Sequence, residues 1–255
     1  MNAKERCSQA GGFKPTCDCP VKGPAVDLVR VLAIDTALEA CAAAILDTGR
    51  AGMITSRSVA MTRGHAEALM PLIAAVMNQA GAEFGDLDRI AVTVGPGSFT
   101  GLRVGVAAAR GIALATGKPA VGLTTLAAMA APFTAAEPGE AVLAVINARH
   151  GRVYMQLFGR GGHSRAAPQI APIHTAIRAA TASPTRIVGN AAKLIADAWP
   201  DNEPPPLLVS AVPAPEIAWV ARLGAGLEDL TAPVRPLYLG EADVHPQEAG
   251  ILPRR

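Results

Sequence analysis

Residues 94–105, VGPGSFTGLRVG, combine four glycines with a serine and a threonine between an apolar run and an alanine-rich run. A glycine loop that leaves a strand and opens a helix can bind a phosphate through the outward-pointing amides of the helix N-terminus. The spacing fits neither G-x-x-x-x-G-K-[ST] nor G-x-G-x-x-G, and Ser98 lacks the flanking glycines of a nucleophile elbow. In the alternative, Gly95 and Gly97 supply positive φ while Ser98 or Thr100 caps the helix.

The alanine-rich helix predicted after this loop has a small residue at every fourth position, namely Gly101, Gly105 and Ala109. A glycine inside a helix costs about 1 kcal/mol relative to alanine, so we expect a neighbouring backbone to approach closely there. Arg103 and Arg110 lie seven residues apart and frame an apolar strip. This pattern suits a contact surface with a polar rim, whereas two solvated arginines are the alternative.

Several elements must position these residues. Residues 29–34 and 40–46 predict a β-hairpin, residues 90–94 the strand before the loop, and residues 120–123 a short strand after the helix. Between them, residues 65–79 carry apolar side chains at helical spacing, which predicts an amphipathic helix.

The pattern restarts near residue 140, where residues 141–158 predict a second hairpin. Superposing the two hairpins places Asp35 over Asn147, which indicates an internal repeat. A strand at residues 185–189 and helices around residues 191–199 and 215–223 follow.

Hairpins followed by helices, twice over, indicate an α/β protein with mixed sheets. The actin-like ATPase (ASKHA) fold, made of two ribonuclease-H-like lobes, has this plan, and its first hairpins hold nucleotide phosphates. We therefore expect a disordered tail at residues 1–27, lobes at 28–132 and 140–245, and a loose tail at 246–255. The candidate nucleotide-binding residues are Asp35, Thr36, Gly95, Gly97, Ser98 and Asn147.

Composition narrows the function. A formal net charge of +2 does not mark a protein that binds nucleic acid by bulk charge. Neither a membrane-spanning segment nor a signal peptide is evident, so a cytoplasmic location is expected. Cysteines at 7, 17 and 19 lack the spacing of a zinc site, and the five histidines provide neither a metal pair nor a catalytic base, which argues against a peptidase.

The chain resembles the TsaB (YeaZ) group. Proteins of this group take part in making threonylcarbamoyladenosine, a modified nucleoside next to the anticodon of bacterial tRNA. The resemblance covers residues 29–245 and is carried by four motifs: LAIDTA, GHAEALMP, VTVGPGSFTGLRVGVAAARGIALATGKPAVGLTTL and INARHGRVY. It implies a non-catalytic scaffold that pairs with and activates the catalytic subunit TsaD and helps recruit the ATPase subunit TsaE. It also implies a homodimer when the chain is alone and contact with tRNA through the complex. No intrinsic cofactor is implied, since ATP is used by the complex.

The resemblance also bears on metals and nucleotides. Where TsaD has a metal-binding histidine pair, this chain has Thr125 and Met129, which are poor ligands, so we expect no metal site. Asn147 stands where the family usually has an acid, which argues against ATP hydrolysis by this chain. The nucleotide-binding residues are therefore expected to be vestigial, and an autonomous ATPase or kinase of the same fold is the alternative function.

The resemblance places the partner interface on the two helices at 65–79 and 101–116. The residues predicted to form it are His65, Leu69, Leu72, Ile73, Val76, Leu102, Arg103, Gly105, Val106, Ala109 and Arg110.

A basic cluster surrounds the second hairpin: Arg149, Arg152, Arg160, His163 and Arg165. These side chains either contact tRNA phosphates in the assembled complex or belong to a solvated loop.

Overall fold

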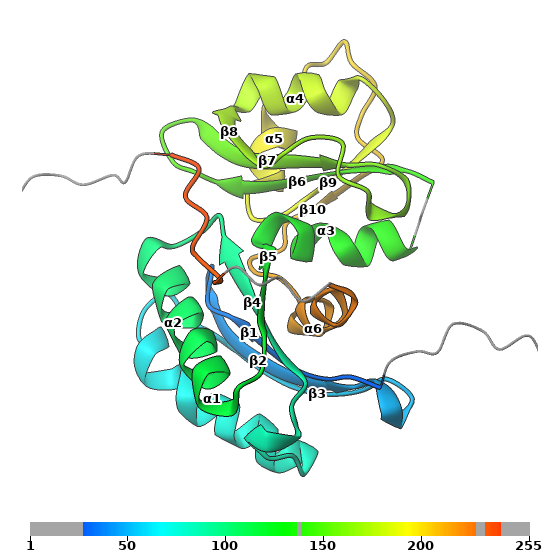
Figure 1. Cartoon of the computed structure of the whole chain (residues 1–255). Helices are drawn as coiled ribbons and strands as arrows, with labels where there is room; N and C mark the ends of the chain where they lie inside the picture. Colours follow the sequence, from blue (N-terminus) through cyan, green and yellow to red (C-terminus); the bar gives the residue numbers. More distant parts are fainter. Residues whose placement is uncertain (1–27, 137–138, 228–232, 241–255) are drawn as a thin grey trace, which may run out of the picture.

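The computed structural model describes residues 28–136, 139–227 and 233–240 of the 255-residue chain. Two five-stranded mixed sheets lie one above the other, with helices on their faces and between them (Figure 1). This arrangement confirms the predicted α/β class with mixed sheets.

The first sheet has the strand order β3-β2-β1-β4-β5. Its strands are β1 (Arg30–Asp35), β2 (Ala40–Asp47), β3 (Met53–Ala60), β4 (Arg89–Gly95) and β5 (Ala120–Thr124). The predicted hairpin is the antiparallel β1–β2 pair, and β4 and β5 add to it in parallel. The edge strand β3 was not predicted, because most of its side chains are exposed and show no alternation between core and solvent.

Two layers of helices cover the first sheet. Helices α1 (His65–Ala80) and α2 (Phe99–Thr116) pack on one face, and α6 (Ile217–Gly226) packs on the other. Figure 1 shows α1 and α2 side by side on the outside of the molecule, with α6 between the two sheets. Both α1 and α2 follow the predicted ranges to within a few residues.

The second sheet has the order β10-β9-β6-β7-β8. Its strands are β6 (Ala141–Asn147), β7 (Arg152–Phe158), β8 (Gln169–Pro172), β9 (Thr185–Val188) and β10 (Leu208–Ser210). Helices α4 (Ile173–Thr181) and α5 (Ala192–Asp197) cover one face, and α3 (Thr125–Ala136) covers the other. The β6–β7 hairpin, β9 and α5 were predicted, whereas β8, α4 and β10 were not. Short 3-10 turns complete the chain: η1 (Thr48–Arg50), η2 (Phe84–Asp86) and η3 (Arg160–Gly162).

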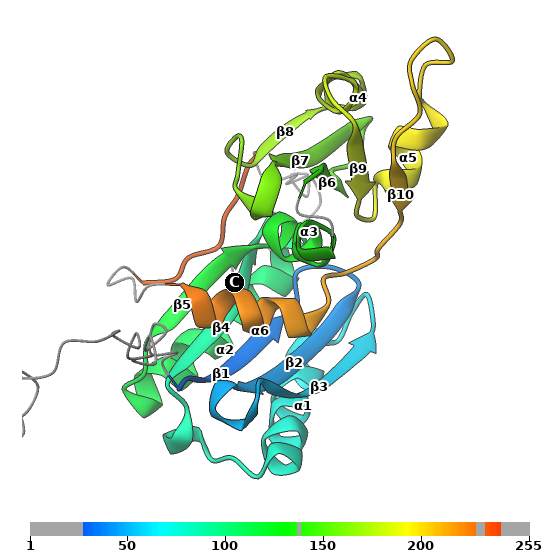
Figure 2. The same cartoon turned by 90° about the vertical axis from the view of Figure 1, so that its right-hand side faces the viewer.

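The C-terminal part of the chain returns to the first sheet. Ile217, Val220 and Ala221 of α6 pack in one cluster with Val31 and Ala33 of β1. Figure 2 shows α6 lying across the first sheet. Residues 233–240 also contact the first sheet, but on its other face, where Val234 is buried in the core beneath α1 and α2. Residues 140–245 were predicted to form the C-terminal lobe. In the structure α6 lies within this range but buries its apolar side on the first sheet, so this part of the prediction is corrected. The predicted tails at 1–27 and 246–255 lie outside the described residues.

Arg89 at the start of β4 holds α6 against the first sheet by hydrogen bonds. Its Nη1 donates to the carbonyl oxygens of Gly224 (3.1 Å), Ala225 (3.3 Å) and Leu227 at the C-terminal end of α6. A cation at a helix C-terminus also interacts favourably with the helix dipole. One side chain from the first sheet therefore satisfies carbonyls that the helix itself leaves unpaired.

We predict that Arg89→Gln lowers the free energy of unfolding by about 2 to 3 kcal/mol, the scale of hydrogen bonds to a charged group. Urea denaturation of the full chain measures the change. The control is Arg57→Gln on the exposed edge strand, expected to stay within about 0.5 kcal/mol of the wild type. Equal stability of the two variants would contradict the role assigned to Arg89.

Candidate functional site

The turn between β1 and β2 packs directly on the glycine loop. The backbone N–H of Ser98 donates to the carbonyl of Ala37 at 2.7 Å, and the Thr36 hydroxyl donates to the carbonyl of Gly101 at 2.7 Å. A Cβ at Gly97 would overlap the Ala37 carbonyl oxygen, and one at Gly101 would overlap that of Thr36. Glycine is required at these positions because two backbones touch there.

The C-terminal segment covers the other side of the same loop. The N–H of Leu237 donates to the carbonyl of Val94 at 2.7 Å. Gly95 has φ of +122°, and a Cβ there would lie 2.6 Å from the Leu237 carbonyl oxygen. Tyr238 then packs on Phe99 at the start of α2, with 5.2 Å between the ring centroids.

The N-terminus of α2 is capped by the chain itself. The Ser98 hydroxyl accepts a hydrogen bond from the N–H of Gly101 at 3.3 Å, so Ser98 rather than Thr100 is the cap. Together with the bond from the Ser98 N–H to Ala37, this contact uses amides that a phosphate would need. Of the two interpretations of the loop, the packing role is the one that its contacts support.

Asp35, predicted to manage a nucleotide-bound metal, is fully buried under this turn. Its Oδ1 accepts hydrogen bonds from the Thr93 hydroxyl and from the N–H of Ala37 at 3.2 Å, whereas its buried Oδ2 has no partner. Burial raises the pKa of Asp35 to about 6, partly offset by these two hydrogen bonds and by His65. Oδ1 therefore holds the turn through the N–H of Ala37, and the carboxyl has no exposed surface in this structure.

Asp35→Asn is predicted to change how stability depends on pH. A pKa of about 6 in the folded state, above the usual 3.8, stabilises the protonated folded form, and this contribution is lost as the pH rises through 6. Asn keeps the accepting oxygen but does not titrate. From roughly pH 4 to pH 7.5 the variant should therefore gain stability relative to the wild type, by at most about 3 kcal/mol.

Chemical denaturation at both pH values measures this difference. Glu67→Gln removes an exposed carboxyl and serves as the control, with the wild-type pH dependence expected. Parallel curves for wild type and Asp35→Asn would rule out a buried, titrating Asp35.

Asn147 occupies the equivalent place in the second sheet but a different environment. Asp35 ends β1 and Asn147 ends β6, as the internal repeat predicted. Asn147 is exposed, its Oδ1 accepts from the N–H of Arg149 at 2.8 Å, and its own N–H donates to Asn190 Oδ1 at 2.8 Å. Among the described residues, no hydrogen bond joins Asn147 to Asp35 or to the glycine loop. The six candidate nucleotide-binding residues thus divide between two separate hydrogen-bond networks.

The two positions that the resemblance matched to a histidine pair, Thr125 and Met129, also lie inside the protein. Thr125 begins α3 and Met129 lies one turn further along, and both side chains are buried. The described ranges contain no group of three or more His, Cys, Asp or Glu side chains that could hold a metal ion. Nor does any helix in the described ranges have the length and apolarity needed to cross a membrane.

Most residues predicted to contact a partner belong to the core instead. Arg103 and Arg110 are exposed, whereas the other nine are buried: His65, Leu69, Leu72, Ile73, Val76, Leu102, Gly105, Val106 and Ala109. Apolar side chains at i, i+4 and i+7 mark the face of a helix that is buried, and here the first sheet buries it. Of the predicted interface residues, only Arg103 and Arg110 are therefore exposed to a partner in this structure, and the interface itself stays a prediction.

The opposite side of these helices, which we term the α1–α2 outer face, has a composition that the sequence analysis overlooked. It consists of Ala66, Met70 and Ala74 on α1 and Ala107, Arg110, Gly111 and Leu114 on α2, all exposed. Leu114 has 87% of its surface exposed and Met70 has 47%. A Cβ at Gly111 would meet no atom within 4 Å, so no contact within the described part of the chain requires glycine there. The helical spacing of Arg103, Ala107, Arg110, Gly111 and Leu114 was the sequence pattern that could have predicted this face.

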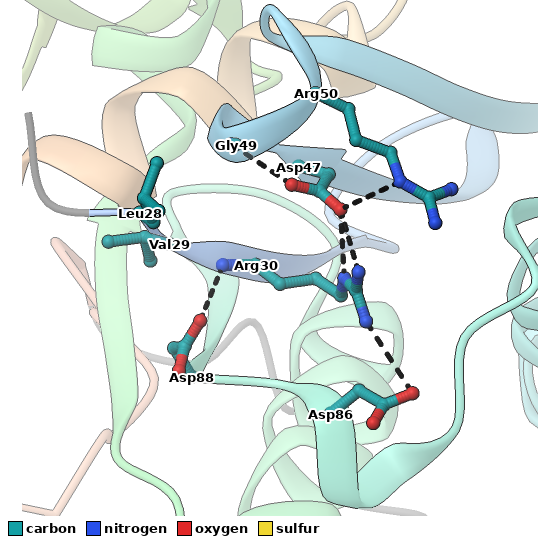
Figure 3. Close-up of a pocket in the computed structure, with 8 residues that line it drawn as sticks. All are labelled: Leu28, Val29, Arg30, Asp47, Gly49, Arg50, Asp86 and Asp88. Atoms are coloured by element: carbon teal, nitrogen blue, oxygen red, sulfur yellow. Dashed lines mark hydrogen bonds and ion pairs between the residues drawn. The ribbon is translucent and has the colours of Figure 1, made fainter.

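The hollow shown in Figure 3 lies at the opposite end of the first sheet from the glycine loop. Its polar groups are already paired: Arg30 donates to Asp47 at 2.7 Å and 3.1 Å, lies 3.5 Å from Asp86, and donates its backbone N–H to Asp88. The hydrogen bond from Arg30 lowers the pKa of Asp47. This cluster joins the ends of β1 and β2 to η2, which is a structural role.

The two kinds of glycine in α2 give a matched prediction. Gly101→Ala should lower the free energy of unfolding by several kcal/mol, about the cost of overpacking against backbone. Gly111→Ala should instead raise it by up to about 1 kcal/mol, because alanine favours the helix and the site is open. Urea denaturation compares both variants, and effects of the same sign would contradict the packing role of Gly101.

The fold and the site define an α/β protein with two mixed five-stranded sheets, whose glycine loop is packed by its own hairpin turn and C-terminal segment. A family model described as TsaD, tRNA N6-adenosine threonylcarbamoyltransferase, matches residues 58–200. The chain belongs to the TsaB (YeaZ) family, as the following relatives show.

The tRNA threonylcarbamoyladenosine biosynthesis protein TsaB of Escherichia coli (strain K12) is 36% identical over 132 residues, which cover 52% of this chain and 56% of that protein. This chain thus spans about half the length of the curated TsaB relatives it matches. An uncharacterized protein of Mycobacterium tuberculosis (strain H37Rv) is 32% identical over 229 residues, covering 87% of this chain and 96% of that protein. The structure of YeaZ from Pseudomonas aeruginosa superposes with a TM-score of 0.66 at 25% identity, covering 83% of this chain and all of that one.

Proposed function

We propose that this chain is a non-catalytic subunit of the machinery that makes threonylcarbamoyladenosine in tRNA. The name of the E. coli relative supports the process. The absence of a catalytic role is supported by the buried Asp35, by the glycine loop whose amides are used internally, and by Thr125 and Met129 at the metal positions. The alternative, an autonomous ATPase or kinase, would need Asp35 to reach a nucleotide, and it is covered by the Thr36–Ala37 turn.

The proposed partner is the catalytic subunit TsaD. A match to the TsaD family model means that this chain shares much of its fold with that enzyme. Two chains of similar fold can pair through equivalent surfaces, as the subunits of a two-fold dimer do. The same argument accounts for the homodimer expected when the chain is alone.

The observation that carries this proposal is the α1–α2 outer face. An exposed leucine such as Leu114 is unremarkable by itself, but here it adjoins small residues and Met70 on two neighbouring helices. Gly111 weakens α2 by about 1 kcal/mol without any compensating contact inside the chain. Close approach of a partner helix would supply that contact, because glycine and alanine allow helix backbones to approach closely. Arg103 and Arg110 would form the polar rim.

The remaining parts of the proposal follow the resemblance. The complex recruits the ATPase subunit TsaE, uses ATP and binds tRNA in the cytoplasm, while this chain holds no cofactor and no metal of its own. Its contribution is to activate TsaD by binding it.

Gly111→Arg tests the interface without disturbing the fold, since the added side chain meets open space. We expect the variant to fold normally but to lose co-elution with TsaD from the same organism in size-exclusion chromatography. Leu194→Arg on α5 is the matched control, because it places the same charge on an exposed leucine outside this face. Co-elution of Gly111→Arg at the wild-type level would reject the α1–α2 outer face as the interface.

A further inference from the structure

Charge is distributed very unevenly along the chain. Residues 141–196 contain seven Lys and Arg and not one Asp or Glu. All other residues together contain 16 Lys and Arg and 21 Asp and Glu, so the formal net charge of +2 hides a segment at +7 and a remainder at −5. Such asymmetry is typical of proteins that turn one side toward a polyanion.

The fold gathers part of this charge at one end of the second sheet. Arg149, His150 and Arg152 lie exposed in the turn between β6 and β7. The N–H of Ile173, the first residue of α4, donates to the carbonyl of Gly151 at 3.2 Å, which brings the start of α4 against this turn.

Helix α4 extends the same surface. His174 and Arg178 are exposed and four residues apart, so they share one side of the helix, while its apolar side packs on the sheet. We term the five residues Arg149, His150, Arg152, His174 and Arg178 the basic strip. Within the described part of the chain, no carboxylate forms an ion pair with Arg149, Arg152 or Arg178.

The other basic residues of the predicted cluster lie elsewhere. Arg160, His163 and Arg165 follow the far end of β7, whose seven residues span roughly 20 Å. The cluster expected around the second hairpin is therefore split between the two ends of the strand.

The turn itself is held in an unusual conformation. Arg149 and His150 both have positive φ, 63° and 49°, which few residues other than glycine adopt. The N–H of Arg149 donates to Asn147 Oδ1 at 2.8 Å, and the N–H of Arg152 donates to the Arg149 carbonyl at 3.0 Å. These contacts position the basic side chains in advance. The N-terminus of α4, which no side chain caps, adds partial positive charge beside them.

We propose that the basic strip binds phosphates of the tRNA backbone. The assignment to tRNA rests on the proposed function, whereas the strip itself rests on charge and geometry. The α1–α2 outer face belongs to the first sheet and the basic strip to the second, so RNA bound at the strip leaves the α1–α2 outer face free for the protein partner. Phosphate contacts of this kind position an RNA without reading its sequence.

The test compares two triple variants that remove the same charge. Arg149→Gln/Arg152→Gln/Arg178→Gln alters the strip, and Arg50→Gln/Arg57→Gln/Arg160→Gln alters exposed arginines elsewhere. Each full chain is assembled with TsaD, and tRNA binding is followed by fluorescence anisotropy between roughly 50 and 200 mM salt. The strip variant should bind about tenfold more weakly or worse, and its slope of log K against log salt should be shallower by about 2 to 3. The control should match the wild type.

Co-elution with TsaD, measured first, separates the two proposals. A wild-type chain that never co-elutes overturns the proposed function and with it the assignment to tRNA. If the complexes assemble but strip variant and control bind tRNA equally, the basic strip is wrong and the scaffold function stands. Binding to a duplex DNA of similar length is measured for the same complexes. If the strip variant loses as much affinity for the DNA as for tRNA, the assignment to RNA is overturned.

Discussion

The structure depends on one close contact, where the Thr36–Ala37 turn rests on the first turn of α2. Gly97 and Gly101 make it possible, because any side chain there would overlap a carbonyl oxygen of the turn. Two hydrogen bonds then join the turn to the loop, and Asp35 is fully buried beneath the turn. The same contact that stabilises the first lobe also uses backbone amides at the start of α2 that a phosphate would otherwise need.

This constraint separates the two sides of α1 and α2. With the hairpin turn and the sheet occupying the inner side, residues such as Leu69 and Ala109 have no exposed surface left. The outer side carries Leu114, Met70 and a glycine without an internal contact. The proposed pairing with a protein partner depends on this exposed side of the two helices.

The two sheets differ in charge as well as in packing. The first lobe offers an apolar helical surface, and the second offers a turn and a helix whose exposed charges are all basic. Helix α6 and residues 233–240 connect the two lobes, because they follow the second sheet in the chain and pack on the first sheet. The proposed protein partner and the proposed RNA would therefore contact different lobes of the chain.

The sequence by itself determined the repeated hairpins, the ranges of α1 and α2 and the family, because periodicity and motifs are local properties, whereas it left the cap of α2 open between Ser98 and Thr100. It also held an unused signal for α4, whose Ile173, Ala176, Ile177 and Ala180 follow helical spacing. Edge strands such as β3 escaped prediction because their exposed side chains show no pattern.

Only the tertiary structure decided what each helix face meets. An apolar stripe is the same whether a sheet or a partner protein covers it, so spacing alone assigned core residues to the interface. Likewise, a glycine loop is the same whether a phosphate or a neighbouring backbone fills it. The long-range contacts of Ala37 and Leu237 settled that choice, since they join residues far apart in the chain.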